Sequence, residues 1–446
     1  MTSTLVPKTV FKHVGSQLPV IVAVSGGSDS IALLNLAASW ANAVDADLRV
    51  VTVDHGLRPE AAAEAAFVAG VCEGLGIRHF TLAWEGLKPT SGISQAARHA
   101  RYLLMEEFAN DVGAEEILVG HTSDDQAETI WMRNSRDGGS PQWRGLSGMA
   151  ELMQLPSGVR VRRPLLNLGR TTLREYLKEI GQPWIEDPSN VDVSFERVRA
   201  RQNLERSSIP KQSIVRLGEL AGRQRAMAAR TVCELLTDKL CVKNGPVFSV
   251  NHGFFENLPE NVAVLAAQIL VALAGGREHF IPHDVAKKII EMRNGDRLTA
   301  GYSIVELRGT CVRLYRENRN LAAMHVPPYS HVIWDNRLMI ENNTSHSYMC
   351  SAMDRGRLKL LEKELDTQID VKPRVALQSV AAVTGEDGSH YLPFVKGTAE
   401  KPGLTFTYKV PAVENFCSQH DFALLEIVQY IRDQMGSVQK SRGLKD

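Results

Sequence analysis

The sequence predicts an α/β protein: a doubly wound parallel sheet in the N-terminal part, then a helical middle domain and a smaller β-rich C-terminal domain. Two observations lead to this prediction. Short β-branched runs alternate with helical patterns along residues 20–134, and the chain of 446 residues is too long for one hydrophobic core. Alternation with short connections is typical of parallel strands covered by helices on both faces. We expect domains at 1–210, 211–325 and 326–446.

The elements of the first domain follow from the period of the apolar residues. The strands are expected at 20–24, 48–53, 79–84 and 116–120. The helices are expected at 30–43, 60–75, 93–109 and 125–134, with one more at 170–180 in a polar stretch that runs from 160 to 206.

The middle of the chain is predicted to be helical, at 213–240, 261–274 and 283–292. A hairpin turning at Arg308–Gly309 follows, and the last third is strand-rich until a closing helix at 422–434. The apolar face of the first of these helices is expected to hold Ile214, Leu217, Ala221, Ala228, Val232 and Leu235.

Composition excludes several classes of protein. The formal net charge is zero, so any case for nucleic acid must rest on local clusters. None of the six cysteines has C-x-x-C spacing, which argues against a zinc ribbon, an iron–sulfur site or a disulfide framework and favours a reducing cytoplasm. The longest apolar run, 262–274, is too short to span a bilayer and predicts a buried helix.

The stretch "SGGSDS" follows the first predicted strand and opens a helix. Glycines allow a sharp turn and close approach of a ligand, and the helix start offers N–H groups to a phosphate. No lysine lies between Lys12 and Lys88, so this is not a Walker A loop. A carboxylate facing phosphates indicates a cation between them, so Asp29 suggests Mg²⁺. The predicted nucleotide-binding residues are Ser25, Gly26, Gly27, Ser28, Asp29 and Ser30.

A second polar stretch, "HTSDDQAET", follows the fourth predicted strand. In a helix, His121, Asp124, Asp125 and Glu128 fall on one face. Acids gathered in this way need a cation, either Mg²⁺ or an ammonium; the alternative is a solvated acidic helix start. Upstream, Arg101 is expected to neutralise nucleotide phosphates, or else to pair with a nearby glutamate.

Residues 133–206 carry twelve arginines and one lysine against nine acids. This bias is typical of a surface that binds phosphates, although some arginines could pair with neighbouring acids instead. The predicted RNA contacts are Arg144, Arg197, Arg199 and Arg201, the last three facing RNA or ATP.

Seven motifs between residues 20 and 205 together resemble the tRNA(Ile)-lysidine synthetase family of the PP-loop ATP pyrophosphatase superfamily. They are "SGGSDS", "VDHGLRPEA", "ARHARY", "HTSDDQAET", "RGLSGM", "RPLL" and "WIEDPSNVDVSFERVRAR", in this order.

The resemblance implies an adenine-nucleotide hydrolase-like fold and a cytoplasmic ligase that forms a C–N bond. By this resemblance, the ligase is expected to use ATP and Mg²⁺ to adenylate the wobble cytidine of a CAU-anticodon tRNA(Ile). Free L-lysine is then expected to attack and give lysidine, with AMP and pyrophosphate released. The implied catalytic residues are Asp29, Asp124, Asp125, Glu128 and Arg101, with Asp29 and Asp125 as metal ligands; which acid orients lysine stays open.

Two departures from the family pattern stand out. Val198 occupies a position where asparagine is common, and the C-terminal third lacks the usual basic, glycine-rich signature. That third could bind the tRNA acceptor stem, form a homodimer contact, or do neither. The alternative functions are 2-thiolation of tRNA, which the absence of paired cysteines disfavours, and a non-catalytic adenine-nucleotide sensor, which would not need the acidic cluster.

Overall fold

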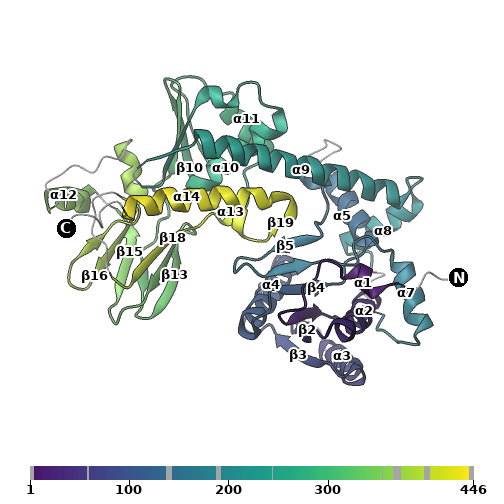
Figure 1. Cartoon of the computed structure of the whole chain (residues 1–446). Helices are drawn as coiled ribbons and strands as arrows, with labels where there is room; N and C mark the ends of the chain where they lie inside the picture. The colour runs from purple at the N-terminus through teal and green to yellow at the C-terminus, as the bar shows by residue number, and fades with distance from the viewer. Residues whose placement is uncertain are drawn as a thin grey trace. The chain divides into compact units, whose positions relative to one another are not determined.

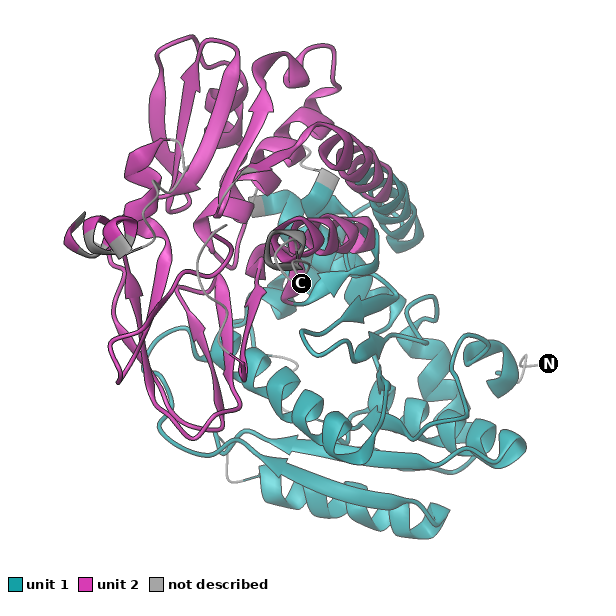
Figure 2. Ribbon diagram, turned by 60° about the vertical axis from the view of Figure 1, so that its left-hand side comes forward, with its two compact units in different colours: residues 1–225, 416–420 teal, residues 226–415, 421–446 magenta. Residues whose placement is uncertain are grey.

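The chain folds into two compact units. The computed structural model describes residues 5–57, 60–136, 143–186, 192–243, 245–353, 355–364, 373–395 and 402–440. The first unit holds Met1–Arg225 and Phe416–His420, and the second holds Ala226–Asn415 and Asp421–Asp446 (Figure 2). The division into three domains stays a prediction.

A seven-stranded sheet forms the centre of the first unit (Figure 1). Its order is β19-β5-β6-β4-β1-β2-β3, and the five strands from β6 to β3 run parallel. The predicted α/β class with a parallel sheet is therefore confirmed. The strands are β1 (Val20–Ala23), β2 (Leu48–Asp54), β3 (Arg78–Ala83), β4 (Glu116–Val119), β5 (Leu152–Gln154), β6 (Arg160–Arg162) and β19 (Cys417–Ser418).

Side chains of alternate strand residues build a core on each face of this sheet. On one face Val20 and Val22 pack with α2 and α7, and on the other Ile21 and Ile117 pack with α4. Hydrophobic runs buried on both faces are what a parallel sheet requires. The helices of the first unit are α1 (Pro7–Val10), α2 (Ser28–Val44), α3 (Ala61–Leu75), α4 (Ile93–Val112), α5 (Ser123–Arg136), α6 (Trp143–Leu146), α7 (Arg170–Glu179) and α8 (Glu196–Arg206).

Helix α8 was not predicted, because it carries few apolar residues for a periodic pattern to reveal. Only Val198, Ala200 and Leu204 are buried. Leu204 packs in a small core with Ile130 of α5 and Ile214 of α9 (Lys211–Lys239). The prediction that Leu217 belongs to the apolar face of α9 is wrong, because this side chain is 42% exposed. The other residues predicted for that face are buried, Leu235 only in part: Ile214, Ala221, Ala228, Val232 and Leu235.

The second unit combines a five-stranded sheet, β7-β8-β11-β10-β9, with sheets of four (β12-β15-β16-β17) and three strands (β13-β14-β18). The hairpin of β10 and β11 turns after Arg308, as predicted. These strands are β7 (Cys241–Lys243), β8 (Val247–Asn251), β9 (Arg297–Ala300), β10 (Ser303–Arg308), β11 (Cys311–Arg316), β12 (Met324–Val326), β13 (Ser330–Trp334), β14 (Leu338–Asn342), β15 (Tyr348–Ala352), β16 (Ala381–Gly385), β17 (His390–Tyr391) and β18 (Leu404–Tyr408).

Helix α10 lies at the centre of the second unit's core. Its apolar run is buried as predicted, and Gln268 satisfies its amide by donating Nε2 to the Ile281 carbonyl at 2.8 Å. The helices of this unit are α10 (Glu260–Gly275), α11 (His283–Ile290), α12 (Arg355–Glu364), α13 (Pro411–Glu414) and α14 (Phe422–Lys440), with 3-10 turns η2 (His252–Phe255) and η3 (Arg374–Ser379); η4 (Gln419–Asp421) joins the two units along the chain.

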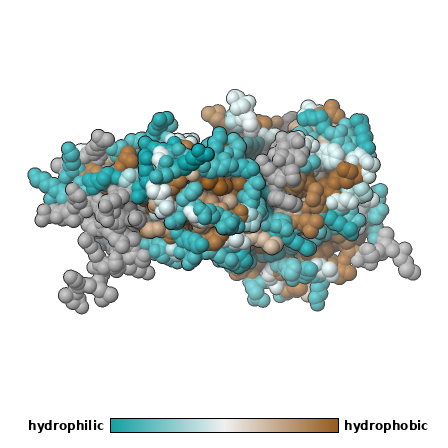
Figure 3. All heavy atoms as spheres, turned by 90° about the horizontal axis from the view of Figure 1, so that it is seen from above, coloured by the Kyte–Doolittle hydropathy of each residue, from teal (hydrophilic) through white to brown (hydrophobic). Residues whose placement is uncertain are grey.

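The surface in Figure 3 mixes hydrophilic with hydrophobic residues. Within the described ranges, no helix has the length and apolar character needed to cross a membrane.

The order of the parallel strands reverses between β1 and β4. From β1 the chain runs outward to β3, and it then returns to place β4 on the other side of β1. In open α/β sheets the crevice at such a reversal, beyond the carboxyl ends of the strands, is where ligands bind. The "SGGSDS" loop follows β1 and the "HTSDDQAET" stretch follows β4, so both lie at this reversal of the strand order.

Gly120 sets how closely these two strand ends approach. A Cβ atom placed there would lie 3.1 Å from the Asp29 carbonyl oxygen and 3.2 Å from the Ser30 Cα. Both atoms belong to the backbone at the start of α2. This helix packs on the sheet, so its backbone cannot give way as the end of a flexible side chain could. We expect Gly120→Ala to lower the free energy of unfolding by about 1–3 kcal/mol in chemical denaturation.

The matched control is Gly70→Ala on α3, where a Cβ atom would meet nothing within 4 Å. Because alanine favours a helix interior over glycine, this variant should gain up to about 1 kcal/mol. A Gly120→Ala protein as stable as the unaltered chain would contradict the tight packing described here.

Candidate active site

The loop after β1 makes a sharp turn and leaves the start of α2 without a side-chain cap. Gly26 has φ +90°, and its carbonyl accepts a hydrogen bond from the Ile185 N–H at 2.9 Å. The N-cap residue is Gly27, and no side chain hydrogen-bonds there. Ser30 instead donates its Oγ to the Gly27 carbonyl at 3.0 Å. The first N–H groups of this 17-residue helix can therefore serve an anion.

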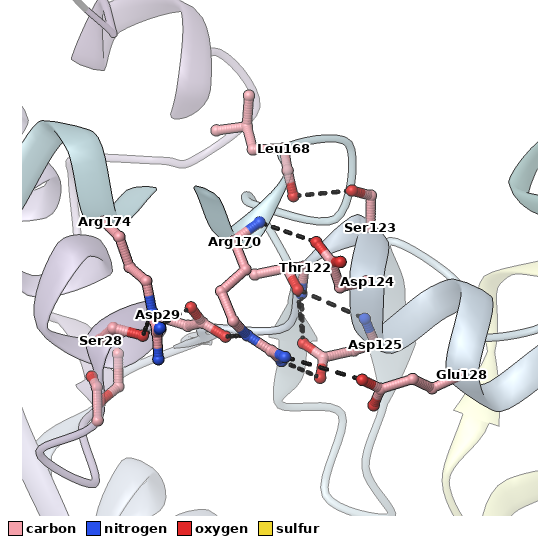
Figure 4. Close-up of polar contacts among 12 residues, drawn as sticks. Ser28, Asp29, Thr122, Ser123, Asp124, Asp125, Glu128, Leu168, Arg170 and Arg174 are labelled. Carbon is pink, nitrogen blue, oxygen red and sulfur yellow. Dashed lines mark hydrogen bonds and ion pairs between the residues drawn. The ribbon is translucent and has the colours of Figure 1, made fainter. Parts of the chain in front are cut away.

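Arg170, the first residue of α7, bridges the two motifs (Figure 4). Its Nε donates to Asp29 Oδ2 at 2.9 Å and its Nη2 donates to Asp125 Oδ1 at 3.0 Å. Burial lowers the pKa of Arg170, but Asp29 and Asp125 outweigh it and the pKa is raised. Burial also raises the pKa of Asp29, and Arg170 only partly opposes this. The sequence pattern predicted a helix at Arg170 but no role for its side chain.

Asp125 and Glu128 lie on α5 with their carboxylates buried. Asp125 Oδ2 accepts hydrogen bonds from the Thr122 N–H at 2.7 Å and from its Oγ1 at 2.9 Å. Glu128 is 2% exposed and accepts from Arg197 Nε and from Arg201 Nε, each at 2.7 Å. Arg197 reaches Asp125 Oδ1 as well, at 3.0 Å.

Asp124 faces a primary ammonium. Lys211 Nζ donates to Asp124 Oδ1 at 2.8 Å, and the Arg170 backbone N–H donates to Oδ2 at 2.9 Å. Burial raises the pKa of Asp124, but the Lys211 ammonium and the Arg170 N–H outweigh it, so the pKa is lowered. This ammonium belongs to the chain itself, so the choice between Mg²⁺ and an ammonium as the bound cation stays a prediction.

Within the described part of the chain, charges in this cluster balance. Asp29, Asp124, Asp125 and Glu128 meet Arg170, Arg197, Arg201 and Lys211. Because the cations come from three other helices, the cluster ties α7, α8 and α9 to the two strand ends. Each of these buried carboxylates has a cationic partner, which offsets part of the free-energy cost of burying a charge.

The donor set also fits Mg²⁺ that arrives with a nucleotide. Mg²⁺ is held by one or two carboxylates together with substrate phosphates, and Asp29 and Asp125 supply two carboxylates at the crevice. Among the residues that the structure covers, no three His, Cys, Asp or Glu side chains form a metal cluster by themselves. These acids therefore suit a metal shared with phosphates better than a permanent metal site.

The other predicted residues lie apart from this cluster. His121 precedes α5 instead of joining its acidic face. Arg101 lies on α4 beside Tyr102. Arg199, on the other side of α8 from Arg197 and Arg201, donates to the carbonyls of Val193 and Ser194. The Arg144 carbonyl accepts from Ser147 Oγ. RNA contact by these arginines stays a prediction.

The chain is similar to known proteins over most of its length. Residues 6–207 match the PP-loop domain family. A tRNA(Ile)-lysidine synthase of Brucella ovis is 34% identical over 439 residues, which cover 95% of this chain and 97% of that protein. The one of Brucella suis biovar 1 gives the same identity and coverage.

Two solved structures match about half of the chain. The U34-tRNA thiolase NcsA from Methanococcus maripaludis with its [4Fe-4S] cluster has TM-score 0.41 and 19% identity, and covers 48% of this chain and 77% of that one. The NMN synthetase from Francisella tularensis has TM-score 0.30 and 11% identity, with 49% and 90% covered.

Removing the charge of Glu128 tests the balance of this cluster. Glu128→Gln keeps the shape of the side chain but removes the carboxylate that Arg201 binds and one of the two carboxylates that Arg197 binds, since Arg197 also donates to Asp125. Because Arg197 is 43% exposed, we expect the loss to lie below that of a fully buried pair, at about 2–3 kcal/mol of unfolding free energy in urea.

Glu186→Gln is the control, since the Glu186 side chain is 60% exposed and pairs with Arg174 at 3.0 Å. It should cost less than about 1 kcal/mol. Equal unfolding free energies of the two variants would show that Glu128 stabilises the fold no more than an exposed ion pair does.

Proposed function

Because the chain belongs to the tRNA(Ile)-lysidine synthases, ligases that form a carbon–nitrogen bond at the wobble position of a tRNA, we propose that it joins free L-lysine to the wobble cytidine of tRNA(Ile) with a CAU anticodon. The observation that carries this is the 34% identity over 95% of the chain. Two further features support it. Both strand-end motifs lie where the strand order reverses, and Asp124 accepts a hydrogen bond from the ammonium of Lys211.

The proposed reaction has two steps. The C2 oxygen of the cytidine attacks the α-phosphorus of ATP, the bond between the α-phosphorus and the bridging oxygen breaks, and pyrophosphate leaves. The side-chain amine of lysine then attacks C2 and loses a proton, while the C2 oxygen leaves with AMP. The product is lysidine, which pairs with adenine instead of guanine.

The loop after β1 is proposed to hold the phosphates of ATP. The uncapped N–H groups of α2 point a partial positive charge toward them. Mg²⁺, held by Asp29 and Asp125, would neutralise charge on the departing pyrophosphate. Arg170 now bridges these carboxylates, so its guanidinium must leave at least one of them when a metal–nucleotide complex binds.

Asp124 is proposed to orient the attacking lysine. Lys211 shows that this carboxylate accepts a primary ammonium at 2.8 Å, and the Lys211 side chain is 44% exposed, so a free lysine can compete with it. An ordinary carboxylate has a pKa near 4 and is a poor base toward an amine of pKa near 10.4. Asp124 therefore positions the amine, and removal of water lowers the pKa of the amine.

The tRNA is proposed to contact Arg144, Arg197, Arg199 and Arg201. Arg197 and Arg201 now bind Glu128, so phosphate contact through them requires exchange of partners. The C-terminal part keeps the three alternatives named above: acceptor-stem binding, a homodimer contact, or neither. A cytoplasmic location is proposed on the cysteine pattern.

A 2-thiolating enzyme is the second candidate, and the thiols disfavour it. The cysteines of the first unit are Cys72 and Cys417, and both are buried. Burial raises the pKa of Cys72 to about 11, so its thiolate is scarce at neutral pH. A nucleotide sensor is disfavoured because it has no use for the acids on α5.

The decisive experiment is mass analysis of the wobble nucleoside. Purified protein incubated with ATP, lysine and an unmodified CAU-anticodon tRNA(Ile) should give lysidine, and omission of any one substrate should abolish it. A thiolated nucleoside, or an unchanged cytidine with all substrates present, would refute the proposal.

The Asp29 carboxylate can be tested separately from the fold. Asp29→Asn should lower tRNA-dependent exchange of labelled pyrophosphate into ATP by about 100-fold or more, because the charge that holds Mg²⁺ is lost. Asp47→Asn is the control: Asp47 lies before β2 and pairs with Arg49 and Arg78. Full exchange in a folded Asp29→Asn protein would rule out the metal role.

A further inference from the structure

Among the four acids of the site, Asp124 differs from the others in the cation that it binds. The other three bind guanidinium groups of arginines. Asp124 Oδ1 instead accepts a hydrogen bond from the primary ammonium of Lys211 at 2.8 Å. Figure 4 shows the Asp124 carboxylate beside the backbone of Arg170, while the guanidinium of Arg170 extends toward the other acids.

The ion pair of Asp124 and Lys211 is suited to exchange of its cation. Lys211 donates one hydrogen bond, its side chain is 44% exposed, and that of Asp124 is 19% exposed. Arg197 is exposed to a similar extent, but it donates to two acids at once. Ion pairs that water reaches are weak, because water solvates both partners when they separate. Of the ion pairs in this site, the one with Lys211 therefore exchanges its cation most readily.

Helix α9 keeps the ammonium of Lys211 close to Asp124 even when the ion pair is open. Lys211 is the first residue of α9, and Ile214, one turn later, packs in a small core with Ile130 of α5. The backbone of Lys211 is thus anchored beside the helix that carries Asp124, and only its flexible side chain has to move. A tethered ammonium has a high effective concentration at its partner, so it returns whenever the carboxylate is vacant.

The ammonium of Lys211 is chemically the same group as the side-chain amine of free lysine in its protonated form. Asp124 Oδ2 already accepts the backbone N–H of Arg170 at 2.9 Å. A second ammonium on this partly buried carboxylate would repel the first, since like charges at such short distance disfavour one another. Contact with Lys211 and contact with free lysine therefore exclude each other.

We propose that Lys211 is an internal competitor for lysine: its ammonium occupies the place of the amine of the substrate on Asp124, and turns out to solvent when lysine binds. This inference rests on the proposed role of Asp124 and adds a regulation of that site. A competitor that occupies a site lowers the apparent affinity of the ligand by the fraction of the protein in which the site is free. For an ion pair this exposed, the expected reduction is up to about fivefold.

The test measures lysine binding in variants of the full chain. Lys211→Met removes the ammonium and keeps the length of the side chain, so we expect lysine to bind about 2–5-fold more tightly in calorimetry. Lys211→Arg offers the carboxylate two donors and should weaken lysine binding. Lys178→Met is the matched control, since Lys178 is an exposed lysine on α7 and its loss changes the net charge equally. Its lysine affinity should equal that of the unaltered chain.

A purely structural ion pair gives a different result. In that case Lys211→Met lowers the free energy of unfolding in urea and leaves lysine binding as it was. Lysine binding that is unchanged or weaker in a folded Lys211→Met protein would overturn the proposal. The Michaelis constant for lysine in lysidine formation is the second readout and should fall in Lys211→Met as the dissociation constant does.

Asp124→Asn separates failure of this inference from failure of the proposed function. If Asp124→Asn weakens lysine binding while Lys211→Met leaves it unchanged, Asp124 holds the amine and the competitor role of Lys211 is wrong. If lysine binds equally well to Asp124→Asn, Asp124 does not hold the amine, and the competitor role fails with it. The ligase activity is decided independently by the mass analysis of the wobble nucleoside in the unaltered protein.

Discussion

The arrangement of the two strand-end motifs depends on the guanidinium of Arg170, which binds a carboxylate of each. The guanidinium donates to Asp29, which follows β1, and to Asp125, which follows β4. The backbone N–H of Arg170 donates to a third carboxylate, that of Asp124. Helix α7 can hold Arg170 there because Leu173 and Leu177 are buried in the core beside α2. The charge of Asp125 raises the pKa of Asp29, and the guanidinium of Arg170 opposes this effect.

Charge is sorted into two zones around the end of β4. On one side four acids and four cations neutralise one another, and on the other Arg98, Arg101 and Arg163 have no carboxylate partner among the described residues. Burial lowers the pKa of His121, which follows β4, well below its usual value, and Arg163 and Arg101 lower it further. A cationic ligand must displace a resident cation from the first zone, whereas an anion entering the second displaces no carboxylate of the described residues.

Local patterns predicted the parts of the fold that depend on neighbouring residues. The four strands from β1 to β4 follow from β-branched runs, and the acids of α5 follow from their helical spacing. The partners of those acids could not be predicted, because Arg170 and Lys211 lie 45 and 87 positions away from the residues they bind. Helix α8 was missed because it is largely polar, and the pairing of Arg197 and Arg201 with Glu128 is visible only once α8 is known to pack beside α5. Strand β19 has two residues and gives no periodic signal.

Strand β19 has a consequence for how the protein is made. It pairs with β5 at the edge of the catalytic sheet, at Cys417–Gln154 and Ser418–Met153. A chain emerging from the ribosome exposes the free edge of β5 while more than 250 further residues are synthesised. During that interval the edge can pair with any extended segment nearby, including the same edge of another nascent chain. Completion of the sheet thus waits until translation has passed residue 418, and a chaperone that shields β5 would act within this window.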